Sequence, residues 1–191
     1  MTAGKGLLSN NHYVFVYGTL KQGQPNHSVM SQTKGRYRFI SRGQTVEHFP
    51  LVVGTLFNIP FILNQRGSGK QVQGELYEVD NEKLVILDEL EAHPFLYERT
   101  LEKIKVEGSN EVTESWIYII HRWRDDFLSE TSIPMENYST LGDHARPYLD
   151  RYVREKLMNA ETTNLFVEIM GFDPREGNSE IGVGKIPEET H

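Results

Sequence analysis

Glu91, at the end of a segment with helical periodicity, is the carboxylate in this sequence best placed to act as a base. On a helix that advances about 100° per residue, it lies about 20° from Leu84 and about 40° from Leu87. Burial against that apolar side would raise the pKa of the carboxyl group. The charges of Asp88 and Glu89 and the negative end of the helix dipole act in the same direction. An acidic helix end exposed to solvent fits the same pattern.

The second candidate is the polar turn formed by Tyr17, Gly18, Thr19 and Leu20, which follows an apolar run at residues 14–16. Gly18 has no Cβ atom, so we expect an unusual backbone dihedral there and close approach of a ligand to the main chain. Successive amides after a strand can form a concave anion site, and Pro25 suits the start of a helix whose N-terminus adds positive charge. These four residues could therefore bind a carboxylate or phosphate, although an ordinary strand-to-helix connection has the same pattern.

Two further side chains are candidates for substrate binding. His27 lies beside the turn, where it would either orient a substrate or act as a structural cap. Arg99 would pair with a substrate carboxylate or with an acidic residue of the helix, or remain a charge on the surface of a strand. The seven histidines are scattered and the chain has no cysteine. We therefore expect neither a metal site nor a cofactor.

Several apolar segments must position these side chains. β-Branched and aromatic residues predict strands at 13–17, 37–40, 51–57, 72–79, 97–106 and 112–121, with turn residues at 107–110. Helical spacing and Pro25 predict helices at 25–31, 81–91 and 146–160. The pattern indicates one α+β domain, residues 13–160, in which strands dominate. Residues 1–12 are interpreted as a flexible leader, and residues 161–191 as a C-terminal extension that is partly disordered.

Composition limits the class of partner. The formal charge of −7 over 191 residues, without a cluster of lysine and arginine, argues against nucleic acid. No apolar stretch approaches the length of a membrane span, and residues 1–12 lack the apolar core of a signal peptide. We therefore expect a cytoplasmic protein. The sequence leaves the oligomeric state open.

A series of short motifs follows the turn in order, within about residues 13–123. The turn continues as Lys21, Gly23, Pro25, Asn26 and His27, and the later motifs are Asn58-Ile59-Pro60, Gly67-Ser68-Gly69, Gly74-Glu75-Leu76-Tyr77-Glu78-Val79-Asp80, Leu87-Asp88-Glu89-Leu90-Glu91, and Pro94 with Leu96-Tyr97 and Arg99-Thr100. Together they resemble the γ-glutamyl cyclotransferase-like (AIG2-like) proteins, and the long form of the turn resembles the γ-glutamylamine cyclotransferase branch.

The resemblance implies a fold and an activity. It implies a small mixed, β-barrel-like sheet with flanking helices. It also implies that Glu91 accepts and donates the proton and that Tyr17, Gly18, Thr19 and Leu20 form the substrate-binding loop. The implied substrates are γ-glutamylamines such as N-ε-(γ-glutamyl)-lysine, which would yield 5-oxoproline and a free amine.

The chemistry of a γ-glutamyl amide fits this assignment, because the substrate carries its own nucleophile. Its α-amino group can reach the γ-carbonyl and close a five-membered lactam once a base removes a proton. Two alternatives stay open. The substrate would be a γ-glutamyl amino acid or glutathione if a basic rim surrounded the site, or the protein would be a binding module that keeps the fold without turnover.

Overall fold

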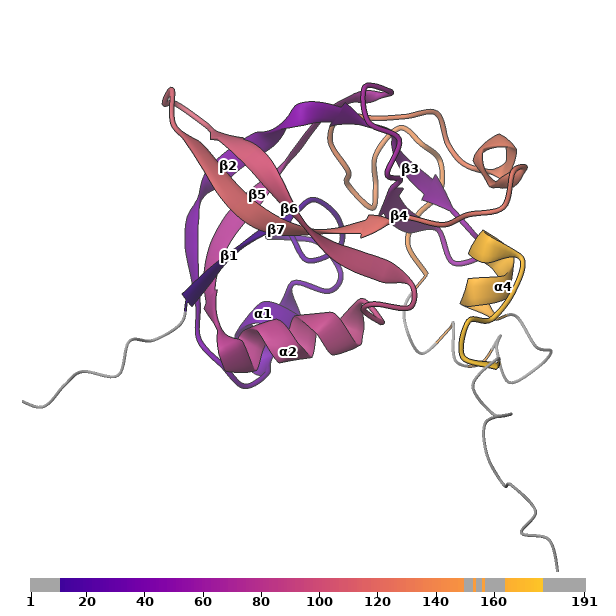
Figure 1. Cartoon of the computed structure of the whole chain (residues 1–191), viewed down its shortest axis with the longest axis horizontal. Helices are drawn as coiled ribbons and strands as arrows, with labels where there is room; N and C mark the ends of the chain where they lie inside the picture. Colours follow the sequence, from indigo (N-terminus) through magenta and orange to yellow (C-terminus); the bar gives the residue numbers. More distant parts are fainter. Residues whose placement is uncertain (1–10, 150–152, 154–155, 157–163, 177–191) are drawn as a thin grey trace, which may run out of the picture.

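The computed structural model describes residues 11–149, 153, 156 and 164–176. Its strands are β1 (Asn11–Val16), β2 (Tyr37–Phe49), β3 (Leu51–Gly54), β4 (Ile59–Ile62), β5 (Lys70–Asp80), β6 (Tyr97–Val106) and β7 (Val112–Ile120). Its helices are α1 (Ser28–Gln32), α2 (Asn81–Leu90), the 3₁₀ helix η1 (Phe127–Glu130) and α4 (Leu165–Met170). The elements and their arrangement are shown in Figure 1.

Five strands form a closed barrel in the order β1-β5-β2-β6-β7. Neighbouring strands are antiparallel, except that β1 meets β7 in parallel where Val14 pairs with Trp116. A closed barrel has no unpaired edges and encloses the residues that point inwards. The predicted fold class, an α+β domain with a small mixed, barrel-like sheet and flanking helices, is confirmed.

Several predicted boundaries were wrong. The predicted strand at 51–57 is two elements, because β3 ends at Gly54 and pairs with β4 in a separate two-stranded sheet. The strand predicted at 37–40 continues to Phe49 through two irregularities in its pairing with β5. The helix predicted at 25–31 begins only at Ser28, because residues 25–27 form turns.

The helix α2 is also one residue shorter than predicted, and it buries a different set of side chains. Asp80 caps its N-terminus by accepting a hydrogen bond from the backbone N–H of Lys83. Leu84 and Leu87 are buried as predicted, whereas Leu90 is 37% exposed. Lys83 is fully buried instead, and its ammonium group donates to the carbonyl groups of Met30 and Thr33. This contact joins α2 to α1, and the two helices lie side by side at the lower end of the barrel (Figure 1).

The chain beyond β7 returns to the small sheet. In α4, Phe166, Ile169 and Met170 are buried, and Arg124 donates from its backbone N–H to the Ile169 carbonyl at 2.8 Å. Glu168 accepts a hydrogen bond from the backbone N–H of Leu56, between β3 and β4. This part of the chain therefore packs beside β3 and β4.

Three predictions about the ends of the chain are only partly covered. Most of the proposed leader, residues 1–10, lies outside the described residues, and residues 11 and 12 already belong to β1. The helix predicted at 146–160 also lies largely outside them, and residues 146–149 have no regular secondary structure. Of the proposed extension, only residues 164–176 are described. The domain boundaries remain predictions.

Candidate active site

Glu91 occupies the C-cap of α2, where the helix ends beside the barrel. Its backbone N–H donates to the Leu87 carbonyl at 3.0 Å, and its carbonyl accepts from the backbone N–H of Tyr97, the first residue of β6. The main chain of Glu91 therefore joins the end of α2 to the start of the barrel strand β6. The predicted position at the end of the helix is correct.

The Glu91 side chain and the turn after β1 line one cavity of about 110 Å³. The wall includes Tyr17, Gly18, Thr19 and Leu20, the residues predicted to bind an anion. Three tyrosines from later in the chain complete it: Tyr97, Tyr118 and Tyr148. The structure thus brings the two predicted centres together, and a ligand in the cavity would meet both.

The turn offers three successive amides to the cavity. Within the described part of the chain, the backbone N–H groups of Gly18, Thr19 and Leu20 donate to no carbonyl or side-chain oxygen. Lys21 is the first residue after them whose amide is used, because it donates to the Gly18 carbonyl at 3.2 Å. Unpaired successive amides form the kind of concavity that binds a carboxylate or an oxyanion.

The reason for a glycine at position 18 differs from the one predicted. The φ angle of Gly18 is not positive, so the expectation of an unusual dihedral was wrong. The constraint is space, because a Cβ atom on Gly18 would lie 2.9 Å from Pro60 Cγ. The helix expected to support the turn is also absent from residues 25–27, so the turn itself supplies the free amides.

Burial gives Glu91 the properties of a base near neutral pH. Although the residue as a whole is partly exposed, burial of its carboxyl group raises the pKa of Glu91 to about 8. Among the described residues, no side chain donates a hydrogen bond to this carboxylate. The predicted contributions of Asp88, Glu89 and the helix dipole are not seen. Burial also raises the pKa of Tyr17, and the charge of Glu91 adds to that effect, so this phenol stays neutral.

Asp88 lies beside the site and connects two other residues. One carboxylate oxygen accepts from Arg99 Nη1 at 2.6 Å, and the other accepts from the Tyr118 hydroxyl at 2.7 Å. The guanidinium group of Arg99 also lies 5.0 Å from the centre of the Trp116 ring. Of the alternatives for Arg99, the pairing with an acid of the helix is the one found, and Arg99 does not line the cavity.

His27 is held in the chain behind the turn. Its Nδ1 donates to the Leu20 carbonyl at 2.9 Å, and it does not line the cavity around Glu91. Its ring makes no hydrogen bond that caps α1. The hydrogen bond to Leu20 therefore makes His27 a residue that stabilises the turn. The structure gives no support to the predicted contact between His27 and a substrate.

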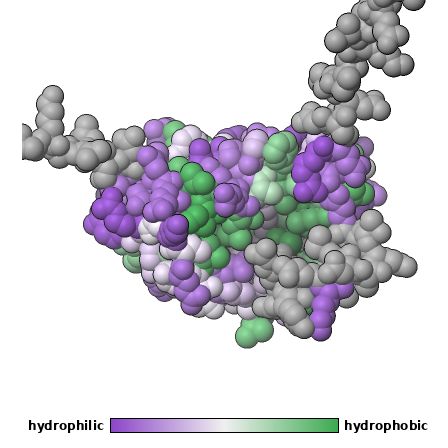
Figure 2. All heavy atoms as spheres, turned by 90° about the horizontal axis from the view of Figure 1, so that it is seen from below, coloured by the Kyte–Doolittle hydropathy of each residue, from purple (hydrophilic) through white to green (hydrophobic). Residues whose placement is uncertain are grey.

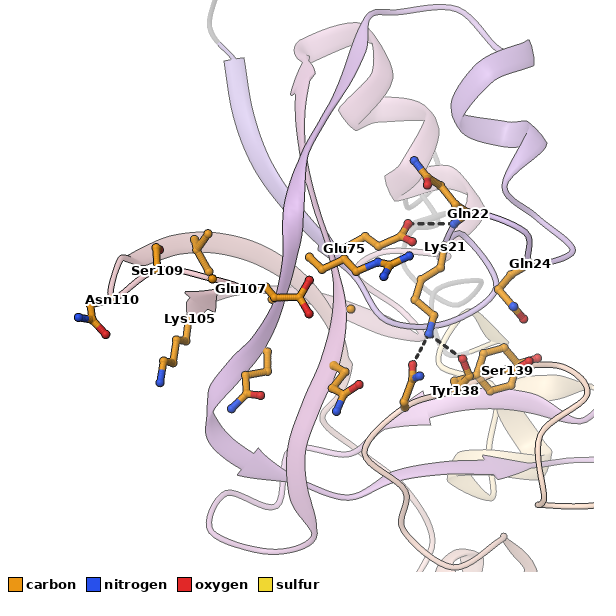
Figure 3. A pocket seen from close by; sticks show the side chains of 18 residues that line it. Lys21, Gln22, Gln24, Glu75, Lys105, Glu107, Ser109, Asn110, Tyr138 and Ser139 are labelled. Atoms are coloured by element: carbon orange, nitrogen blue, oxygen red, sulfur yellow. Dashed lines mark hydrogen bonds between the residues drawn. The ribbon is translucent and has the colours of Figure 1, made fainter.

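A larger groove of about 770 Å³ is lined in part by Lys21, Gln22 and Gln24, which follow the turn, and Figure 3 shows its lining. Lys21 points from the turn to the segment at 137–138, where it donates to Asn137 Oδ1 and the Tyr138 carbonyl, each at 2.6 Å. Burial lowers the pKa of Lys21 to about 8. The Glu75 carboxylate accepts from the backbone N–H of Gln22 at 2.9 Å. Both buried charges therefore anchor the turn that carries the free amides.

The cavity around Glu91 is mostly apolar away from the turn. Ile59, Pro60, Leu90, Leu96 and Leu165 line it, and among the described lining residues there is no lysine or arginine. Seen from below, the molecule has hydrophobic side chains gathered in a hollow on the side of α1 and α2 (Figure 2). A rim of basic side chains would favour a substrate that carries a second carboxylate. No such rim is found among these residues.

Three polar residues at the cavity were not predicted as site residues. Asn26 was present in the resemblance but was not assigned a role, and Tyr118 sits in a predicted apolar strand with nothing local to mark its hydroxyl group. Tyr148 fell in a segment predicted to be helical. Only the packing of the chain places these three side chains at the cavity.

Comparison with known proteins gives the family. Residues 14–140 match the model described as γ-glutamyl cyclotransferase, AIG2-like. The chain belongs to this family. The resemblance inferred from the motifs is therefore confirmed. The matched region contains Glu91 and the turn, whereas Tyr148 and Leu165 lie beyond it.

Relatives in the γ-glutamyl cyclotransferase, AIG2-like family match over most of their length. γ-Glutamylaminecyclotransferase C of Danio rerio is 43% identical over an alignment of 151 residues that covers 76% of this chain and 98% of the relative. γ-Glutamylaminecyclotransferase of Rattus norvegicus is 40% identical over an alignment of 147 residues, which covers 73% of this chain and 97% of the relative. The crystal structure of an AIG2-like protein from Mus musculus aligns with a TM-score of 0.70 at 38% identity, covering 74% of this chain and 97% of that one.

The histidine, aspartate and glutamate side chains of the described residues form no group of three or more that could hold a metal ion. Of the helices in the described ranges, none is long and apolar enough to cross a bilayer.

Proposed function

We propose that this protein is a γ-glutamylamine cyclotransferase that converts N-ε-(γ-glutamyl)-lysine and related γ-glutamylamines to 5-oxoproline and a free amine. The observation that carries the proposal is the single cavity in which Glu91 faces a turn with three unpaired amides. The relatives named γ-glutamylaminecyclotransferase support the same activity.

Glu91 supplies the proton transfers in this proposal. Its carboxylate removes a proton from the α-ammonium group of the substrate, and the resulting amine attacks the γ-carbonyl carbon to form the new C–N bond. The protonated Glu91 then gives that proton to the leaving nitrogen as the original C–N bond breaks. A second proton passes from the new ring nitrogen to the released amine, again through Glu91, so that the lactam is neutral and the amine leaves as an ammonium ion. General acid–base catalysis of this kind contributes typically ~10²–10⁴-fold, and the ring closure within one bound molecule adds a further factor.

The turn supplies the anion site. The amides of Gly18, Thr19 and Leu20 bind either the α-carboxylate of the glutamyl group or the oxyanion that forms on the γ-carbonyl. Loss of one such donor typically costs about 3–4 kcal/mol when it stabilises an oxyanion. The reaction needs neither a metal nor a cofactor, because both the nucleophile and the leaving group belong to the substrate.

The lining of the cavity supports an alkylamine as the leaving group. A γ-glutamyl amino acid or glutathione carries a second carboxylate close to the bond that breaks. No basic side chain is present among the described lining residues to receive it, whereas Ile59, Leu90 and Leu96 offer apolar contact to the methylene groups of a lysine side chain.

The test is to incubate the purified protein with N-ε-(γ-glutamyl)-lysine and to measure the release of 5-oxoproline and lysine. Glu91→Gln should keep the fold and lower turnover by ~10²-fold or more. Glu89→Gln is the matched control, because Glu89 is an exposed glutamate on the same helix. A Glu91→Gln variant as active as the parent would remove Glu91 from the mechanism. Release of 5-oxoproline from γ-glutamyl amino acids or glutathione alone would show that these compounds, and not γ-glutamylamines, are the substrates. No release from any of these compounds would favour a binding module.

A further inference from the structure

Asn26 fixes the turn that carries the free amides. Its backbone N–H donates to the Thr19 carbonyl at 2.9 Å, and its side-chain Nδ2 donates to Thr19 Oγ1 at 3.0 Å. Thr19 is the central residue of the three whose amides are unpaired. Both the main chain and the side chain of Asn26 therefore hold the middle of the turn.

Tyr148 in turn holds the side chain of Asn26. Asn26 Nδ2 donates to the Tyr148 hydroxyl oxygen at 3.1 Å, and the hydroxyl group donates to Asn26 Oδ1 at 3.4 Å. Both residues line the cavity around Glu91. Because one hydroxyl group contacts both ends of the Asn26 amide, it holds this side chain in place beside Thr19.

The segment around Tyr148 is itself anchored to two parts of the chain. The Tyr148 backbone N–H donates to Thr140 Oγ1 at 3.0 Å. On either side of it, the Pro147 carbonyl accepts from Asn58 Nδ2 at 2.8 Å, and the Leu149 N–H donates to the Phe57 carbonyl at 3.2 Å. Residues 57 and 58 lead into β4, whose Pro60 lies against Gly18. The segment at 147–149 thus contacts both Asn26, which holds the turn, and residues 57 and 58, which lead into β4.

We propose that Tyr148 is a positioning residue of the Glu91 site, acting through Asn26 and Thr19 on the amides that bind the α-carboxylate of the glutamyl group. This rests on the proposed function for the identity of the ligand. It assigns a role in the site to a segment beyond residues 14–140, the part that the family model matches. The segment at 147–149 is accordingly part of the binding site.

The proposal is tested with Tyr148→Phe, which removes the hydroxyl group and keeps the ring. With N-ε-(γ-glutamyl)-lysine as substrate, KM should rise about fivefold, the effect of one hydrogen bond, while kcat changes less than about twofold. The inhibition constant of 5-oxoproline should rise by the same factor, because this product keeps the carboxylate and lacks the leaving amine. A purely structural role would lower thermal stability without this parallel change.

Two further variants make the result specific. Adding Tyr148→Phe to Asn26→Ala should have no further effect on KM, because the hydroxyl group acts through that amide. Tyr13→Phe is the control, since Tyr13 is an exposed tyrosine of β1. Additive effects of the two substitutions, or a Tyr148→Phe variant with the kinetics of the parent, would overturn the proposal.

Failure of the proposed function would give a different result. If the parent released no 5-oxoproline from any γ-glutamyl amide, binding of 5-oxoproline would be measured by titration followed by NMR. Weaker binding to Tyr148→Phe than to the parent would then uphold the positioning role while the activity was rejected. Equal binding, or no binding to the parent, would overturn the positioning role as well.

Discussion

Gly18 lies against the ring of Pro60, so closely that a Cβ atom at position 18 would be 2.9 Å from Pro60 Cγ and 3.7 Å from Pro60 Cβ. The proline belongs to β4, in the small two-stranded sheet, and the glycine belongs to the turn after the first barrel strand. Contact between them sets the distance from the small sheet to the three free amides.

Gly18→Ala should therefore displace the turn and weaken substrate binding. We expect a stability loss of about 1–3 kcal/mol, typical of overpacking, together with a higher KM. Adding Pro60→Ala removes the atom at 2.9 Å and should restore much of the lost binding. Thermal unfolding and steady-state kinetics of the two single variants and the double variant check this. If the double variant binds no better than Gly18→Ala, the contact with Pro60 is not the constraint.

The raised pKa of Glu91 predicts how activity depends on pH. A pKa of about 8 means that the carboxyl group of the free enzyme is mostly protonated at pH 7 and becomes a base as the pH rises. We therefore expect kcat/KM to rise about tenfold per pH unit below 8 and to level off above it. The profile with N-ε-(γ-glutamyl)-lysine between pH 5.5 and 9 checks this. A rate already constant from pH 5.5 would show that the acting base has an ordinary carboxyl pKa.

The same pKa predicts how stability depends on pH. Because the folded state raises the pKa of Glu91 from 4.5 to about 8, it binds a proton that the unfolded chain releases in this range. The contribution of the protonated Glu91 carboxyl group to the free energy of unfolding is complete below about pH 4.5, and it is lost as the pH rises through 8. Glu91→Gln cannot ionise, so its Tm should exceed that of the parent by a margin that grows between pH 5 and pH 9. The same margin at both pH values would mean that the carboxyl group is not buried as described.

Asp88 should matter although it does not line the cavity. Asp88→Ala removes the acceptor of both Arg99 and the Tyr118 hydroxyl group, and Tyr118 lines the cavity. We expect a loss of about 1–3 kcal/mol in the free energy of unfolding, because a partly buried donor is left without its acceptor, and a lower kcat/KM. Denaturant unfolding and kinetics would be compared with Glu89→Ala, which alters the exposed neighbouring carboxylate. Equal stability of the two variants would contradict this role of Asp88.

Much of the candidate site is readable in the sequence because its signals are local. An apolar strand that ends at a glycine-containing turn predicts an anion site, and helical spacing predicts that Glu91 lies on the side of Leu84 and Leu87. The motifs in the same segments identified the family. The strands and α2 could be predicted for the same reason, since side-chain periodicity follows directly from backbone geometry.

Tertiary structure alone decided which of these segments meet. Closure of the barrel through Val14 and Trp116, the burial of Lys83 and the contact of Gly18 with Pro60 all join residues far apart in the chain. The Asn26 contact that places Tyr148 at the site is of the same kind. No local pattern encodes such contacts, because burial and hydrogen-bond partners depend on what the rest of the fold brings to each side chain. The sequence by itself therefore determined the chemistry available, and the fold determined that Glu91 and the amides of the turn share one cavity.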